Sequence, residues 1–105
     1  MAQIDRDVLA AVREFLSKIS QCGIHIESAY LFGSYARNLA NRWSDIDVAV
    51  ISPDFSEDRL AERIRLMKLS AEIDSRIEPV PFHSHDFRDD NPLAGEIMKT
   101  GIPCL

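Results

Sequence analysis

The segment of residues 45–51, Asp-Ile-Asp-Val-Ala-Val-Ile, constrains the fold of this chain more than any other. It is short, apolar and rich in β-branched residues, and a Ser-Pro pair ends it, which is typical of a buried strand. Alternate residues of a strand point to opposite sides, so Asp45 and Asp47 face one way while Ile46 faces the other. Two neighbouring carboxylates repel each other unless a cation lies between them. The segment therefore predicts either a solvated strand end or a cation site, and Mg²⁺ prefers such oxygen ligands.

The rest of the chain alternates between helical and extended patterns. Apolar residues at helical spacing predict helices, and short apolar runs bounded by Gly or Pro predict strands. The predicted helices cover 4–20, 34–40, 56–74 and 92–100, and the predicted strands cover 26–32, 45–51 and 76–82. A polar loop is expected at 83–92. This order predicts an α+β (α/β) fold in which a small sheet of about three strands, mixed or antiparallel, is covered by helices.

The predicted helix 56–74 is amphipathic. Ser56 is its expected N-cap, because a serine hydroxyl can accept a hydrogen bond from a free amide of the first turn. Four apolar residues at helical spacing form one stripe along it. They are Leu60, Ile64, Met67 and Ala71.

Length and composition bound the class of protein. With 105 residues, 46% of them hydrophobic, the chain has the size of one domain, and we expect a single domain over 1–105. No apolar run approaches the length of about 20 residues that a membrane span needs, and no basic and then apolar leader begins the chain, so no membrane partner and a cytoplasmic location are expected. The net charge of −5 argues against direct nucleic-acid binding.

Two further features lie near the paired aspartates in the predicted fold. Gly33-Ser34 follows the strand 26–32, where glycine allows close approach of a ligand and free amides with a serine hydroxyl suit a phosphate. Glu78 lies inside the strand 76–82 and is a candidate third carboxylate, for a second metal ion or for the proton of an attacking hydroxyl. A solvent-facing Glu78 and an ordinary Gly-Ser turn are the simpler interpretations.

The spacing of these residues resembles a known signature. The stretch Leu31-Phe32-Gly33-Ser34-Tyr35-Ala36-Arg37, followed by Ser44-Asp45-Ile46-Asp47-Val48-Ala49-Val50, resembles the DNA-polymerase-β-type nucleotidyltransferase superfamily. The short chain is similar to its minimal nucleotidyltransferase (MNT) branch, whose members are often paired with HEPN-domain toxins. The resemblance extends from about Leu9 to Ile102. It implies the nucleotidyltransferase (polymerase β-like) core as the fold.

The resemblance also implies roles for residues. Gly33 and Ser34 would hold the triphosphate of ATP, and Arg37 would touch phosphate. Asp45 and Asp47 would bind Mg²⁺, as one ion or two, with Glu78 as the third carboxylate. Asn38 departs from the glycine that is common after this arginine, and asparagine tolerates left-handed backbone better than most residues.

The activity that the resemblance implies is transfer of AMP from ATP to a hydroxyl of a HEPN toxin, with the chain acting as antitoxin in a hetero-oligomer. A minimal chain of this kind would receive its acceptor from a partner subunit. Two alternatives stay open: an antitoxin that neutralises its partner by binding alone, and the nucleotidyltransferase subunit of an enzyme that modifies a small molecule such as an antibiotic.

Overall fold

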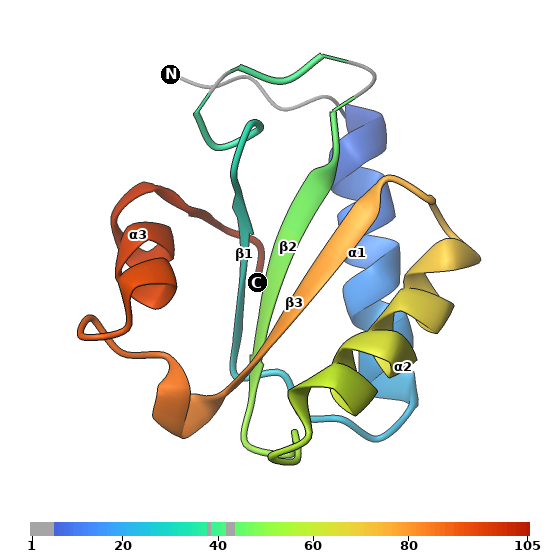
Figure 1. Cartoon of the computed structure of the whole chain (residues 1–105). Coiled ribbons are helices and arrows are strands. Elements are labelled where there is room, and N and C mark those ends of the chain that lie inside the picture. Colours follow the sequence, from blue (N-terminus) through green and yellow to red (C-terminus); the bar gives the residue numbers. More distant parts are fainter. Residues whose placement is uncertain (1–5, 38, 42–43) are drawn as a thin grey trace.

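The computed structural model describes residues 6–37, 39–41 and 44–105, and a mixed sheet lies at its centre (Figure 1). The strands of the described chain are β1 (Ser28–Phe32), β2 (Ile46–Ser52), β3 (Ile77–His83) and β4 (Ile102–Pro103). Their order in the sheet is β3-β2-β1-β4, with β1 antiparallel to both neighbours and β2 parallel to β3. The predicted α+β class and its mixed sheet are confirmed. The two-residue strand β4 was not predicted, because a pair of residues is too short to show a period.

Helices cover both faces of this sheet. Helices α1 (Arg6–Gln21) and α2 (Arg59–Ala71) lie on one face, and α3 (Pro92–Thr100) lies on the other (Figure 1). The alternation along β2 explains the two layers: Ile46, Val48 and Val50 pack with α1, whereas Ala49 and Ile51 pack with α3. Asp47 therefore shares the α3 face, at the amino end of β2. None of the described helices is long and apolar enough to cross a membrane.

The N-terminus of α2 differs from the prediction. The N-cap is Asp58, not Ser56, and its carboxylate accepts a hydrogen bond of 3.0 Å from the Ala61 amide. The Ser56 hydroxyl instead accepts a hydrogen bond of 3.3 Å from the amide of Asp58, the residue before the first helical residue, Arg59. The helix ends at Ala71 rather than at 74, and the predicted loop 83–92 contains a short 3₁₀ helix, η1 (Ser84–Asp86).

We expect Asp58→Ala to lower the free energy of unfolding by about 1 kcal/mol, since the substitution removes an N-cap. Ser56→Ala is the matched control and should cost clearly less, because Ser56 caps no helical amide. Urea denaturation followed by circular dichroism measures both. Equal losses in the two variants would contradict the assignment of Asp58 as the cap.

The buried face of α2 is also not the one that the apolar stripe predicts. Glu62, Leu66 and Ser70 are the buried residues of this helix. Glu62 is satisfied by the Ser56 amide, which donates to its carboxylate at 2.8 Å, and the Ser70 hydroxyl donates to the Met67 carbonyl. Polar side chains that find such partners can face a core without a large penalty. The stripe is consequently left on the outside of the helix.

Candidate active site

The parallel register of β2 and β3 brings two of the predicted carboxylates together. Asp47 pairs with Glu78 across the two strands, each at the second position of its strand. Both are half-buried. Side chains paired in this way share one face of the sheet, so both carboxylates lie on the α3 face at the amino ends of β2 and β3. We call Asp47, Glu78 and the adjoining Asp45 the carboxylate site.

Asp45 approaches this site from just outside the sheet. It is exposed and precedes β2, which begins at Ile46. The Ile46 amide donates to the Arg76 carbonyl at 2.8 Å, which fixes the entry of the chain into β2 beside the start of β3. Besides burial, the negative charge of Asp45 raises the pKa of the Asp47 carboxyl.

The electrostatics of the carboxylate site are unfavourable for the protein alone. Burial raises the pKa of the Asp47 carboxyl above its ordinary value, and the negative charges of Asp45 and Glu78 raise it further. A bound cation would remove this repulsion, and carboxylate oxygens are the donors that Mg²⁺ takes. The residues therefore fit a divalent cation chemically. Across the described residues, however, no three His, Cys, Asp or Glu side chains are already grouped closely enough to hold a metal ion.

Glu78 of the carboxylate site also has a partner on α2. Its carboxylate lies 3.5 Å from the Arg63 guanidinium and forms an ion pair with α2. Both side chains are partly exposed, and pairs of this kind are weak. Sequence reasoning missed Arg63, because nothing in the spacing of an exposed helical arginine shows which strand it will reach.

Gly33 meets the carboxylate site from β1. It follows Phe32, which pairs with Asp47 across β1 and β2, and its φ of +70° is a left-handed conformation. A Cβ atom added at Gly33 would lie 2.2 Å from Oδ2 of Asp47. The glycine predicted to admit a phosphate thus also admits the Asp47 carboxylate against the backbone of the turn.

The turn after Gly33 is not the short helix predicted for 34–40. Among the residues described there, the backbone forms turns, in which the Arg37 amide donates to the Gly33 carbonyl and the Leu39 amide to the Ser34 carbonyl. The left-handed glycine explains this, since it starts a tight turn rather than a right-handed helix. Ser34 is half-buried and Arg37 is exposed. Asn38 lies outside the described residues.

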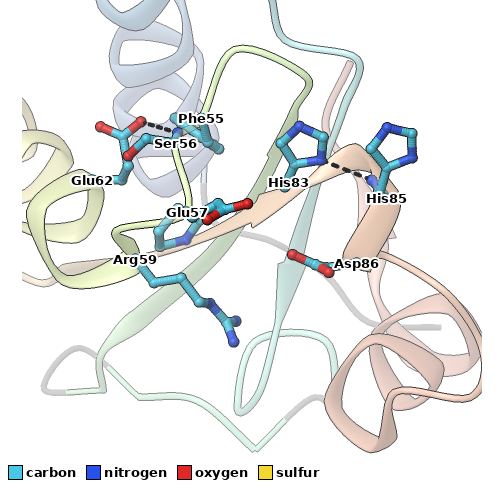
Figure 2. Close-up of a pocket in the computed structure, with 9 residues that line it drawn as sticks. Phe55, Ser56, Glu57, Arg59, Glu62, His83, His85 and Asp86 are labelled. Atoms are coloured by element: carbon cyan, nitrogen blue, oxygen red, sulfur yellow. Dashed lines mark hydrogen bonds between the residues drawn. The ribbon is translucent and has the colours of Figure 1, made fainter.

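A separate cavity lies at the other end of the same two strands (Figure 2). It has a volume of about 320 Å³, and His83, Pro81 and Phe55 line it near the carboxyl ends of β2 and β3. His83 and His85 stack with ring centroids 4.8 Å apart, and the His85 amide donates to Nδ1 of His83. The carboxylate site lies at the amino ends of the strands, so the two places are distinct.

Comparison with known proteins identifies the family. A model of the nucleotidyltransferase domain matches residues 9–91, which is most of the chain. The chain belongs to the nucleotidyltransferase domain family. The matched segment includes Gly33, Ser34, Arg37 and the whole carboxylate site. The roles of these residues toward nucleotide and metal stay predictions.

A sequence match to a protein of known activity supports this assignment. The protein adenylyltransferase MntA of Shewanella oneidensis is 37% identical over 59 residues, which is 56% of this chain and 42% of that protein. The match thus spans less than half of the length of this relative.

Two solved structures share the fold. A putative nucleotidyltransferase from Sulfolobus solfataricus superposes with a TM-score of 0.64 at 16% identity, covering 98% of this chain and 90% of that one. A mutant of the MntA-HpeT toxin-antitoxin superposes with a TM-score of 0.62 at 22% identity, covering 96% and 72%. These two likenesses bear on the fold alone.

Proposed function

We propose that the chain is a Mg²⁺-dependent nucleotidyltransferase that transfers AMP from ATP to a hydroxyl of a HEPN-domain toxin, and so acts as an antitoxin. The observation that supports this best is the pairing of Asp47 with Glu78, beside Asp45 and against Gly33, on a nucleotidyltransferase fold. The match to a protein adenylyltransferase supports AMP as the transferred group and a protein as its acceptor.

Each residue of the site has a proposed role toward the metal ion or the nucleotide. Asp45 and Asp47 would hold Mg²⁺, with Glu78 completing the carboxylate set. When bound, the cation supplies positive charge to the triphosphate and orients the reacting oxygens. The Gly33-Ser34 turn offers amide and hydroxyl donors to the triphosphate, and Arg37 offers an exposed positive charge to the same group.

The reaction follows from this arrangement. The acceptor hydroxyl oxygen forms a bond to the α-phosphorus of ATP, the bond from that phosphorus to the bridging oxygen breaks, and pyrophosphate leaves. We assign to Glu78 the role of accepting the proton of the hydroxyl, and its pairing with Asp47 and its half-buried side chain support this assignment. The chain contributes position and charge rather than a covalent intermediate.

The test is incubation of the chain with Mg²⁺, ATP labelled at the α-phosphorus, and a HEPN-domain toxin as the proposed partner. We expect label on the toxin, and none when Mg²⁺ is chelated or when the chain is the Asp45→Ala/Asp47→Ala double variant. Equal labelling by the double variant would overturn the proposal. Full neutralisation of the toxin in cells by that variant would show instead that binding alone is the function.

A further inference from the structure

An exposed apolar row lies along the outside of α2. Leu60, Ile64 and Met67 are 69%, 45% and 43% exposed, and Ala71 continues the row. Their spacing of four, three and four residues places them on one line along the helix, away from the buried Leu66. We call this row the outer stripe. Single exposed apolar residues are ordinary, but a contiguous row on one helix is typical of an interaction surface.

A hollow extends the outer stripe toward β3. It has a volume of about 250 Å³ and is lined by Leu60, Arg59 and Arg63 from α2 and by Val80 and Pro81 from β3. β3 is an edge strand of the sheet. A helix laid along the outer stripe could therefore place one side chain in this hollow between α2 and the sheet edge.

The charge of α2 itself is opposite to that of the whole chain. The chain has a net charge of −5, whereas α2 has four basic residues and one acidic residue, the buried Glu62. Arg63 and Lys68 flank the stripe on its two sides. Arg63 pairs with Glu78 at 3.5 Å, and Arg65 pairs with the buried Glu62 at 3.6 Å. The Arg63 pair is partly exposed at both ends, and such pairs exchange partners at little cost.

These charges decide between two occupants. A second copy of the chain would bring the same basic flanks toward Arg63 and Lys68, which disfavours self-association. A helix with an apolar row between acidic flanks complements both the stripe and its rim. We propose that the outer stripe of α2 binds an amphipathic helix of a partner protein, apolar on the bound side and flanked by Asp or Glu.

Arg63 links this surface to the carboxylate site. The same guanidinium that borders the stripe lies 3.5 Å from Glu78. A partner bound to α2 would thus stand beside the carboxylate site, and this consequence rests on the proposed function, whereas binding to the stripe does not.

The test uses two synthetic peptides and neither nucleotide nor Mg²⁺, so its outcome is independent of transferase activity. Each peptide is a helix of about 20 residues with the same leucine row. One has glutamate on both flanks and the other has lysine. Fluorescence anisotropy should show that the glutamate peptide binds at least about tenfold more tightly than the lysine peptide. Added salt should reduce this difference in affinity.

The variant Ile64→Glu/Met67→Glu should lose at least about tenfold in affinity for the glutamate peptide. The matched control is Leu93→Glu/Met98→Glu on α3, where the wild-type side chains are 43% and 40% exposed, and it should bind like wild type. Equal binding of both peptides, no binding, or equal losses in both variants would overturn the proposal. A concentration-dependent dimer in sedimentation, abolished only by the α2 variant, would assign the stripe to a second copy instead.

Discussion

Asp47→Asn should slow labelling of the proposed toxin partner by at least about two orders of magnitude while leaving the fold at least as stable as wild type. In the proposed function Asp47 holds the Mg²⁺ that stabilises the triphosphate, so loss of its charge should lower the transfer rate by on the order of 100- to 1000-fold. Stability should not fall, because the ionised Asp47 is disfavoured by burial and by the charges of Asp45 and Glu78. The amide has nearly the same shape and no charge, so it relieves that repulsion.

The two readouts are the initial rate of label transfer and the free energy of unfolding in urea without Mg²⁺. Asp90→Asn is the matched control, since Asp90 is an exposed carboxylate paired with Arg88 outside the carboxylate site. The control should leave the transfer rate unchanged. An Asp47→Asn protein that transfers at the wild-type rate would contradict the catalytic role. One that is inactive and also markedly less stable would show that Asp47 acts through the fold.

Gly33→Ala should be the most damaging small substitution in the turn. An alanine there costs about 1–2 kcal/mol for the left-handed backbone. Its Cβ would also lie 2.2 Å from Oδ2 of Asp47, so the carboxylate or the turn must move. We expect a loss of about 2–3 kcal/mol in the free energy of unfolding and a transfer rate near zero.

Gly23→Ala separates the two causes. Gly23 has a φ of +87°, and nothing lies within 4 Å of the position that a Cβ atom would take there. Alanine at Gly23 should therefore lower the free energy of unfolding only by the cost of the left-handed backbone. In an Asp47→Ala background, Gly33→Ala should also have only that cost, because the clashing oxygen is gone. A cost that is equal at Gly23 and Gly33, or unchanged in the Asp47→Ala background, would show that the carboxylate and the turn are not coupled.

The parts of the fold that follow from local patterns were predictable. The alternation in residues 45–51 is enough to place Asp47 opposite Ile46, and the Gly-Ser pair is enough to end β1. What local patterns lack is register, since no residue in β2 or β3 shows that Asp47 will pair with Glu78. The ion pair of Glu78 with Arg63 joins residues on different elements and follows only from the packing of α2.

The orientation of α2 shows how a clear period can mislead. The apolar stripe predicts the face that packs on the sheet, yet α2 buries Glu62 and Ser70 instead. Glu62 holds the Ser56 amide, and this contact ties the loop before α2 to the helix. The same orientation of α2 buries the hydrogen-bonded Glu62 and exposes the stripe. The exposed stripe is the surface for which a partner is proposed.

The most direct measurement compares ATP labelled at the α-phosphorus with ATP labelled at the γ-phosphorus, each incubated with the chain, Mg²⁺ and the HEPN-domain toxin proposed as its partner. Transfer of AMP predicts label on the toxin from the α position alone, a toxin heavier by one adenylyl group, and one pyrophosphate released for each toxin modified. Label from the γ position, or an unmodified toxin under conditions where the chain still neutralises it, would contradict the proposed function.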